Sequence, residues 1–396
     1  MRMSNIPLSR GLLRTNGSIL DCTDQLTPIA TSYGMNGILW NGFLNIQEVI
    51  RDELGKKFPE VDLPTPIEVA GGFFSRESTP SEEEIAVKYI QETVKGGLSD
   101  SKCFFYFNKK LQFNTSHNTL FDNGIQSNAN HQLVVYSFTQ TDKEMYEQGK
   151  VIKALFKKIF ERIGLPAFFV QGLTFSVLSN ETIMSLFPNG NERLLYYPDS
   201  KTWSDKNVLI LERELMPFDD EEEILKSYGI TSGLYHCEEH CALKVGEFIY
   251  WGQVKTRYQR FMFDSIHSPF FVGKYIIDLS RAMDALIYHN TGNSGFVWPY
   301  DISPYQLHMI CSSDRMEKAE YIYDELRRKK ISVLFDDRDI PFDEKIELAR
   351  LLGIPKVIVI NDDTNRTDGG VFLVNRETWE QDYTNYVEIL KSPDGL

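Results

Sequence analysis

The most constraining feature of the sequence is a block near its end in which two apolar runs enclose a charged segment. Residues 333–360 read VLFDDRDIPFDEKIELARLLGIPKVIVI. The first run meets Asp336-Asp337-Arg338-Asp339, a helical segment follows, and a purely aliphatic run comes after Gly353-Ile354-Pro355. Short apolar runs bounded by turn residues are typical of buried strands. The block therefore predicts a β-α-β unit.

This unit belongs to a longer alternation that fills the end of the chain. The pattern predicts strands at 306–311, 332–335 and 356–360, helices at 315–329 and 343–352, and one further strand at 371–374. Strands that alternate with helices of about 10 to 15 residues are typical of an α/β sandwich. We expect residues 304–396 to form such a domain.

The first 290 residues follow a different pattern, with short strands scattered between helices. We expect an α+β core with an antiparallel sheet in residues 1–290, and a linker at 291–303, where glycine and proline are frequent. The predicted helices are 44–54, 82–94, 142–163 and 278–288, and the predicted strands are 103–107, 132–138, 166–173, 192–197, 206–211, 248–251 and 270–277.

The composition is that of an ordinary globular chain of 396 residues, 42% of them hydrophobic. No apolar run reaches the roughly 18 to 20 residues that span a membrane, so we expect no membrane partner. An odd number of cysteines, five, indicates a reducing compartment, and we expect a cytoplasmic protein. The alternative is an organellar presequence, since three arginines precede the first acidic residue, Asp21.

The net charge of −14 argues against broad affinity for polyanions, and we expect no DNA partner. From residue 303 onward the chain has 19 acidic and 13 basic residues. Arg327-Arg328-Lys329-Lys330 is the only basic cluster there, so any RNA contact would be local. The alternative is a solvated helix end.

The last domain resembles the anticodon-binding domain of class IIa aminoacyl-tRNA synthetases, most of all that of prolyl-tRNA synthetase. The resemblance rests on Trp298-Pro299, Ser303-Pro304, Asp336 to Asp339 with Lys345, Leu352-Gly353-Ile354-Pro355 and the segment VFLVNR at 371–376. It implies RNA contacts at Asp337, Arg338 and Lys345, and tRNA or another structured RNA as a partner. One departure is Asp343, where the family usually has glycine.

A weaker resemblance covers the first 290 residues. Tyr136-Ser137-Phe138 with the helix that follows is similar to the segment after motif 2, and the segments GEFIYWGQVK at 246–255 and GKYIIDLSR at 273–281 resemble the approach to motif 3 and motif 3 itself. Residues 34–54 lie where the dimer-forming motif 1 would be, and the bacterial insertion domain is missing. The resemblance implies a class II synthetase-like antiparallel core and a homodimer.

The catalytic residues of the family are only partly present. Amino-acid activation brings a carboxylate to the α-phosphate of ATP, and an arginine is the natural group to bind that phosphate. The family places this arginine in motif 2, where the chain has Asn114, and no arginine occurs between Arg76 and Arg162. We therefore expect no ordinary prolyl-adenylate formation.

At other positions that the family uses for catalysis and binding, some residues match the family and others differ. Ser81 and Glu83 resemble the Thr-x-Glu loop that orders the proline amine, although an N-capped acidic helical turn explains them equally. Arg281 lies where the family stacks an arginine on adenine, and the alternative is a salt-bridged helix arginine. Ile276 and Asp278 replace glycines that let the backbone close on ATP, and Glu247 replaces a common histidine. ATP with Mg²⁺ is the cofactor that the resemblance implies.

The segment His236-Cys237-Glu238-Glu239-His240-Cys241 has zinc-ligand chemistry. Six contiguous residues cannot turn four side chains toward one ion, so Cys237 and Cys241 would need ligands from elsewhere. The alternative is a partly exposed turn. Cys103 and Cys311 lie in strand-like runs, where buried thiols are inert.

Three functions remain open from the sequence. The first is a non-catalytic prolyl-tRNA synthetase-like protein that serves as an RNA-binding, regulatory or accessory subunit. The second is an ATP-dependent ligase that activates a different amino acid or carboxylate. The third is a divergent but active prolyl-tRNA synthetase, which the missing arginine disfavours.

Overall fold

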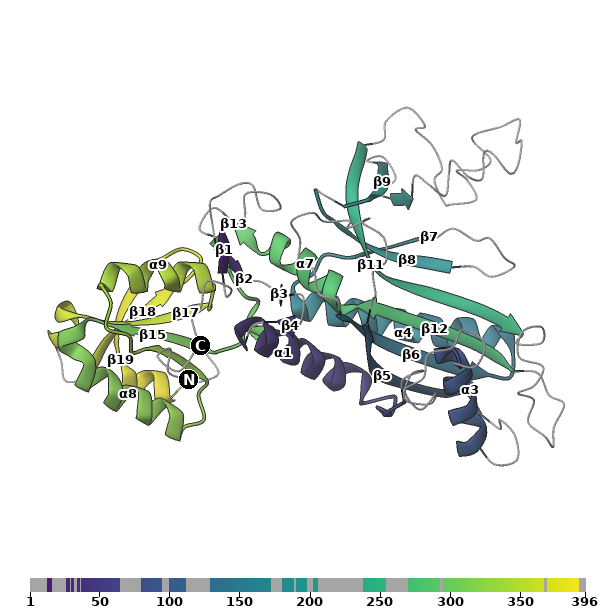
Figure 1. The fold of residues 1–396 in the computed structure, drawn as a ribbon, viewed down its shortest axis with the longest axis horizontal. Helices are drawn as coiled ribbons and strands as arrows, with labels where there is room; N and C mark the ends of the chain where they lie inside the picture. The colour runs from purple at the N-terminus through teal and green to yellow at the C-terminus, as the bar shows by residue number, and fades with distance from the viewer. Residues whose placement is uncertain are drawn as a thin grey trace.

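The structure, a computed structural model, describes most of the chain but not all of it. The described residues are 13–15, 26–28, 30–31, 34–35, 37–64, 80–94, 100–111, 129–171, 180–188, 190–197, 202–205, 238–253, 270–292, 295–366 and 369–391. Figure 1 shows two parts side by side, one built on a large sheet and one on a small sheet.

An antiparallel sheet of eight strands forms the larger part. Its order is β10-β9-β11-β12-β6-β5, with β8 also paired to β11 and β7 paired to β8. The strands are β5 (Lys102–Leu111), β6 (Ala129–Thr139), β7 (Phe168–Gln171), β8 (Asn180–Leu186), β9 (Glu192–Tyr197), β10 (Thr202–Asp205), β11 (Glu238–Gln253) and β12 (Phe271–Asp278). The predicted antiparallel core is confirmed.

The predicted strand at 248–251 is only the end of β11, which is 16 residues long. This strand pairs with β9, β8 and β12 in succession and contains irregular register near Lys244. The local pattern missed its length because the irregularity breaks the alternation of side chains. β8 and β10 were not predicted, and the predicted strand at 206–211 lies outside the described residues.

Helices cover both faces of the sheet, and they divide its side chains into two cores. Three helices, α1 (Gly37–Leu54), α4 (Asp142–Ile163) and α7 (Leu279–His289), pack with Leu133, Val135 and Ile277 on one face. On the other face α3 (Glu82–Thr93) packs with alternate residues of the same strands, such as Val134 and Tyr136. The period of two along β6 therefore decides which side chains meet α3.

The smaller sheet has the order β16-β15-β17-β18-β19. Strands β15 (Leu307–Cys311), β16 (Val333–Asp336) and β17 (Lys356–Ile360) are parallel, while β18 (Gly370–Asn375) and β19 (Gln381–Asn385) are antiparallel neighbours. Helices α8 (Met316–Arg328) and α9 (Phe342–Leu352) pack against separate cores on its two faces, with α10 (Tyr386–Lys391) beside α8. The β-α-β prediction is confirmed; β19 and α10 were not predicted.

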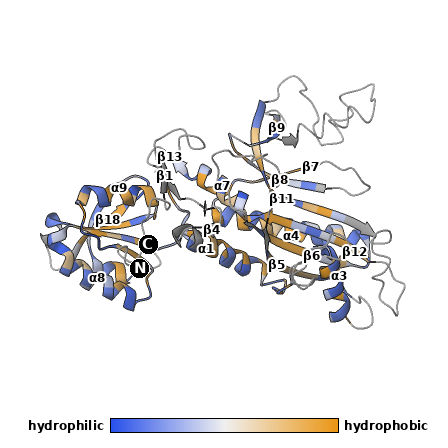
Figure 2. Ribbon diagram, in the orientation of Figure 1, coloured by the Kyte–Doolittle hydropathy of each residue, from blue (hydrophilic) through white to orange (hydrophobic). Residues whose placement is uncertain are grey.

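Figure 2 shows that the ribbons of α8 and α9 alternate between hydrophobic and hydrophilic colour. This is the pattern of helices with one buried face. On α8 the buried residues are Ala319, Ile322, Tyr323 and Leu326. Their spacing of three or four residues is the signal from which the helix was predicted.

The residues expected to form a linker are packed between the two parts. Trp298 is 1% exposed, and its indole nitrogen donates to the carbonyl of Leu352 at 3.1 Å. Its backbone nitrogen donates to Gly353 at 2.9 Å. Leu352 and Ile354 belong to the same apolar core as α1 and α4. The segment β13 (Thr291–Gly292), β14 (Gly295–Phe296) and η3 (Tyr300–Ile302) therefore joins one continuous core.

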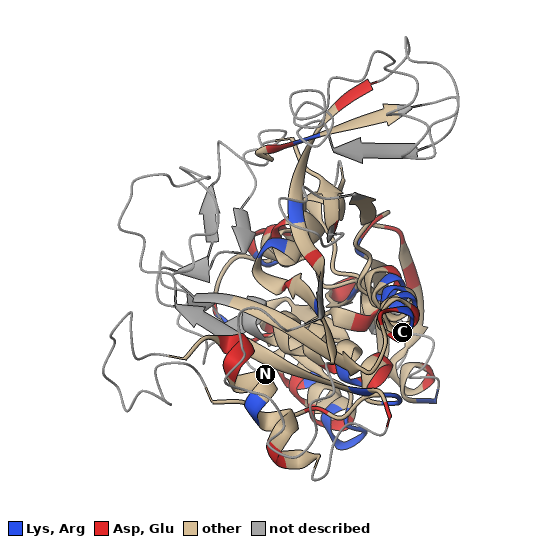
Figure 3. Ribbon diagram, turned by 90° about the vertical axis from the view of Figure 1, so that its right-hand side faces the viewer, with Lys and Arg blue, Asp and Glu red and all other residues tan. Residues whose placement is uncertain are grey.

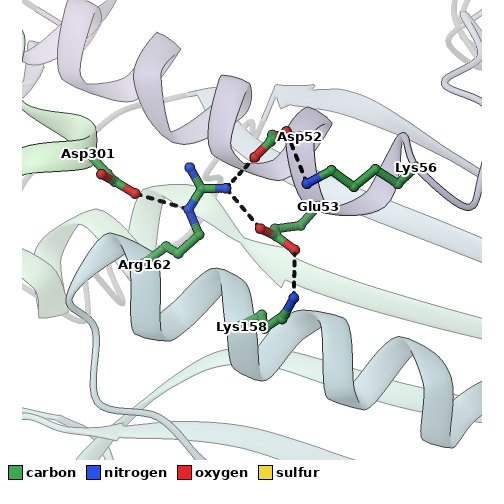
Figure 4. Close-up of polar contacts among 6 residues, drawn as sticks. All are labelled: Asp52, Glu53, Lys56, Lys158, Arg162 and Asp301. Carbon is green, nitrogen blue, oxygen red and sulfur yellow. Dashed lines mark hydrogen bonds and ion pairs between the residues drawn. The ribbon is translucent and has the colours of Figure 1, made fainter. Parts of the chain in front are cut away.

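A polar network reinforces this junction (Figure 4). Arg162, in the last turn of α4, donates through Nε to Asp301 of η3 at 3.0 Å. Its Nη1 lies 2.6 Å from Asp52 and 2.9 Å from Glu53, both on α1. One guanidinium thus connects two helices of the large part to the segment that leads into the small part.

Candidate functional site

The first candidate site lies where α3 begins on the large sheet. Ser81 N-caps this helix: its Oγ accepts from the nitrogen of Glu84 at 3.1 Å, and Glu84 Oε2 accepts from the Ser81 nitrogen at 2.8 Å. This reciprocal pair is a capping box. The first turn that follows is acidic and is red in Figure 3. A role of Ser81 in amino-acid binding remains a prediction.

A lysine that the sequence analysis did not single out lies against this acidic turn. Lys274 extends from β12 and is 4% exposed. Its Nζ lies 2.7 Å from Oε1 of Glu83 and 3.4 Å from Oε2 of Glu82. The other oxygen of Glu82 accepts from Asn108 of β5 at 2.9 Å. We call Glu82, Glu83, Asn108 and Lys274 the α3 ionic cluster.

The α3 ionic cluster shifts the pKa values of Glu83 and of the neighbouring Tyr106. Burial acts to raise the pKa of the Glu83 carboxyl, but the charge and hydrogen bond of Lys274 outweigh it, and the pKa lies below its ordinary value. Burial and the two nearby carboxylates raise the pKa of Tyr106. Glu83 is therefore a carboxylate already neutralised by a cation of its own chain.

One sequence signal pointed to this lysine. Lys274 is the one charged residue between Phe270 and Ile277, a run that is otherwise apolar apart from Gly273. A cation inside a central strand is expensive unless it meets an acidic partner. The partner lies 191 residues away in the chain, and the sequence alone could not identify it.

Arg281 lies in the first turn of α7, the helix that directly follows β12. Its backbone nitrogen donates to Oδ1 of Asp278, which N-caps the helix, at 3.1 Å, and its Nε lies 3.7 Å from Oδ2 of the same residue. Lys244 and Glu247 of β11 form a separate ion pair at 2.7 Å. Lys274 and Asp278 are four positions apart along β12, or about 13 Å. Arg281 is thus paired as the alternative interpretation expected, and nucleotide binding there remains a prediction.

The segment that corresponds to motif 2, residues 112–118, lies outside the described residues. Among the described residues, the sheet face with the α3 ionic cluster offers mainly carboxylates, and its cations Lys274, Lys244 and Arg281 are paired with acidic residues. A nucleoside triphosphate at this face would therefore need cations other than these three for its phosphates.

The second candidate site lies at the end of β16 in the small sheet. Arg338 binds the fully buried Asp336 through two hydrogen bonds, at 2.8 Å from Nε and 2.6 Å from Nη2. Lys345 of α9 is also fully buried, and its Nζ donates to the carbonyls of Cys311 at 3.1 Å and Asp336 at 3.4 Å. Lys345 therefore holds the ends of β15 and β16 together beneath the surface.

These positions differ in how they meet solvent. The side chain of Arg338 is 22% exposed, and Asp337 is partly exposed. Lys345, in contrast, is not exposed at all. Of the three predicted RNA contacts, Asp337 and Arg338 lie where a ligand can reach them, while Lys345 supports the loop that presents them. Direct RNA contact at all three remains a prediction.

His308, on β15, was missed by the sequence analysis. It is fully buried, and neither ring nitrogen has a hydrogen-bond partner among the described residues. Burial lowers its pKa to about 4; the charge of Asp336 acts against this and that of Arg338 acts with it. His308 is therefore a neutral imidazole within an apolar sheet face.

The zinc prediction falls partly outside the described residues, because Cys237 is not among them. Cys241 lies half-buried on β11, where its sulfur contacts Nη1 of Arg193. No group of three or more metal-ligating side chains is assembled in the described part of the chain. Within the same residues, no helix is long and apolar enough to cross a membrane.

Comparison with known proteins agrees with this architecture. Residues 306–392 match the anticodon binding domain family. A crystal structure of prolyl-tRNA synthetase from Cryptosporidium parvum, in complex with L-proline and AMP, is similar over 92% of this chain and 73% of that one, with a TM-score of 0.63 and 14% sequence identity. The fold is that of a class II aminoacyl-tRNA synthetase core followed by an anticodon-binding domain.

Sequence similarity points to one group of relatives. Proline–tRNA ligase of Persephonella marina is 38% identical over 101 residues, which are 24% of this chain and 18% of that protein. Its counterpart from Exiguobacterium sibiricum is 33% identical over 132 residues, 32% of this chain and 23% of the relative. The aligned regions thus span less than a quarter of these curated relatives. The chain has a distant and partial similarity to prolyl-tRNA ligases.

Proposed function

We propose that this chain is a prolyl-tRNA synthetase-like protein without ordinary aminoacylation activity, which binds tRNA or another structured RNA as a regulatory or accessory homodimer in the cytoplasm. The observation that carries the proposal is the pairing of Lys274 with Glu83 at 2.7 Å. Glu83 matches the family residue that orders the amine of proline. Here an ammonium of the chain itself already lies against that carboxylate.

The sequence supports the same proposal independently. No arginine lies between Arg76 and Arg162, so the motif 2 position that binds the α-phosphate of ATP in the family lacks its arginine. Activation of a carboxylate needs a positive group where charge builds up on the phosphorus. Proline would therefore lack an unpaired carboxylate for its amine, and ATP would lack the arginine for its α-phosphate.

Exchange of pyrophosphate into ATP, measured across a panel of amino acids, tests the absence of activation. We expect no exchange above background with proline or any other amino acid. Robust exchange with proline would instead support a divergent active prolyl-tRNA synthetase. The control is an active prolyl-tRNA ligase assayed under the same conditions.

RNA binding needs its own test, because it can fail independently of activation. We expect the chain to bind proline tRNA more tightly than a random RNA of equal length at physiological salt. The reason is that proteins that recognise an RNA sequence rely on directed contacts to unstacked bases. Arg338→Ala should weaken tRNA binding, while Arg315→Ala, which removes a cation paired with Asp362 at 2.8 Å, should not. Equal affinity for both RNAs would contradict the proposal.

Because Arg338→Ala leaves Asp336 buried without its partner, a second variant is needed. Arg338→Lys keeps the charge but loses the two-point contact. Reduced tRNA affinity in a folded Arg338→Lys variant would assign the effect to recognition. Sedimentation or light scattering of the purified chain tests the homodimer, for which α1 is the predicted interface helix.

The second candidate is an ATP-dependent ligase for another carboxylate. One observation favours it: Lys274 neutralises Glu83 within the site, so a carboxylate that lacks an amine would meet no unpaired acid there. ATP-dependent adenylation of carboxylic acids without amino groups, measured by pyrophosphate exchange, would support this candidate over the first.

A further inference from the structure

The charged residues of the anticodon-binding domain are distributed unevenly over the two ends of its sheet. Acidic residues gather where the parallel strands end: Asp314, Asp337, Asp339, Asp362 and Asp363. Two arginines at this end are paired, Arg338 with Asp336 at 2.6 Å and Arg315 with Asp362 at 2.8 Å. A polyanion that approaches this end therefore meets mainly carboxylates.

The other end of the sheet has both signs of charge, with its cations gathered at α8 and the exposed Glu377 and Glu380 beside Trp379. Helix α8 ends there with Arg327, Arg328, Lys329 and Lys330, all exposed, which we call the α8 basic end. Exposed Arg350, in the last turn of α9, lies at the same end of the sheet and stacks on Trp379 at 4.6 Å from the ring centroid. Helices that follow parallel strands run back across the sheet, so their carboxyl ends meet where the strands begin.

The four cations of the α8 basic end differ in their contacts. Arg328 pairs with Glu325, and Arg327 lies over the ring of Tyr323 at 5.6 Å. Lys329 and Lys330 form no ion pair with any described residue. A helix end needs at most one or two cations to offset its dipole. Two further unpaired lysines leave charge available for an external anion.

The backbone holds this cluster firmly in place. Ile331 donates to the carbonyl of Leu326 at 3.1 Å, and Ser332 donates to the side chain of Gln306 at 2.8 Å. Lys330 has a φ of 62°, a left-handed conformation in which glycine is the usual residue. Gln306 directly follows Tyr305, whose hydroxyl accepts from Asn41 of α1 at 3.4 Å. The α8 basic end thus lies on the side of the domain that faces the junction.

We propose that the α8 basic end is a phosphate-binding surface for RNA, which positions the RNA backbone at the junction side of the anticodon-binding domain. This inference rests on the proposed RNA-binding function and adds where the phosphates bind. Phosphate contacts orient a nucleic acid and supply most of its salt-dependent affinity. Side chains at the acidic end that contact bases, such as Arg338, would add specificity without attracting the phosphate backbone of the RNA.

The test compares salt dependence of RNA binding in the full chain. The variant Lys329→Gln/Lys330→Gln should weaken binding of fluorescent proline tRNA several-fold near physiological salt. It should also make the slope of log Kd against log salt shallower by about 1.4 to 1.8, the value for two lost phosphate contacts. The control Lys88→Gln/Lys143→Gln removes the same charge from exposed positions on α3 and α4 and should leave the slope unchanged.

A second variant separates charge from folding. Lys329→Gln/Lys330→Gly loses the same charges but places glycine in the left-handed conformation, which should raise the melting midpoint. Weaker tRNA binding by this more stable variant would support the proposal. An unchanged salt slope in both variants, with wild-type binding intact, would overturn it and leave the proposed function standing.

Two other outcomes are informative in different ways. If the wild-type chain binds tRNA no better than random RNA, the proposed function itself fails. If the wild-type chain binds vesicles of anionic phospholipid through these lysines and binds no RNA, the surface serves a membrane, and the RNA proposal is overturned.

Discussion

The ammonium of Lys274 lies 2.7 Å from Oε1 of Glu83, where the buried lysine of β12 meets the partly exposed first turn of α3. This contact joins the central strand of the large sheet to a helix 191 residues earlier in the chain. Where the family resemblance predicts a substrate amine, the chain places its own ammonium. The same contact makes the fold depend on a charge pair.

Replacing Lys274 by methionine should therefore be costly. Lys274→Met keeps most of the volume but leaves the partly exposed Glu82 and Glu83 without a cation. Breaking a fully buried pair costs about 3 to 5 kcal/mol, and partial exposure lowers the expected cost to about 2 to 3 kcal/mol. Urea denaturation at neutral pH measures the loss in free energy of unfolding. Glu83→Gln/Lys274→Met should recover part of it, and a cost below about 1 kcal/mol would contradict the buried-pair interpretation.

The pair also predicts a pH dependence with a defined sign. The pKa of Glu83 is lowered in the folded state, so its stabilising contribution is present above the ordinary carboxyl pKa of about 4.3 and is lost as pH falls through the lowered value. Glu83→Gln should flatten the decline in stability below about pH 4.3. Unfolding measured from pH 7 to pH 3 compares the two proteins.

His308 predicts a second and separable pH effect. Its pKa is lowered to about 4 by burial, so the unfolded chain binds a proton below about pH 6.5 while the folded chain does not. Stability should therefore fall with decreasing pH between those values. His308→Leu should remove this slope, because leucine binds no proton in either the folded or the unfolded chain. Equal slopes for both proteins would show that His308 is not the source.

Gly42 predicts a steric effect at the junction. A Cβ at this helical position would lie 2.5 Å from the ring of Trp298. Alanine normally favours a helix over glycine by about 1 kcal/mol. Here we expect Gly42→Ala to destabilise by about 1 to 3 kcal/mol, the usual range for overpacking. Thermal unfolding should show that the smaller ring in Gly42→Ala/Trp298→Phe relieves part of this cost.

Arg162 predicts a salt-sensitive contribution to the same junction. Its guanidinium is 33% exposed and contacts Asp301, Asp52 and the nearly buried Glu53. We expect Arg162→Met to cost about 1 to 2 kcal/mol, mostly through Glu53, and Asp301→Asn to cost less than about 0.5 kcal/mol. Denaturation at low and high salt should show that the Arg162→Met penalty shrinks with salt. A salt-independent penalty would point to lost packing instead.

The C-terminal domain could be predicted closely from sequence because its signals are local. Strands 306–311, 332–335 and 356–360 and the two intervening helices all correspond to observed elements. The helical spacing in α8 and the aliphatic run of β17 each identify an element without reference to distant residues. The edge elements β19 and α10 have weaker patterns, since most of their residues are partly exposed.

The predicted linker at 291–303 shows what local signals leave out. Its glycines and prolines are typical of a connection between domains, and the segment does contain two short strands and a 3-10 turn. Yet Trp298 is buried, and Leu334, Leu352 and Ile354 share the core of the large part. Composition describes the backbone of a segment but not what packs against it.

The sequence by itself determined the order of strands and helices in the last domain, the resemblance that this order carries, and the absence of an arginine between Arg76 and Arg162. Only the tertiary structure decided that Lys274 meets Glu83, that Lys345 is buried, and that the basic cluster at the end of α8 lies at the opposite end of the small sheet from Arg338. The physical reason is the range of the interactions. Periodicity and composition are properties of neighbours in the chain, whereas ion pairing, burial and surface charge depend on residues that only folding brings together.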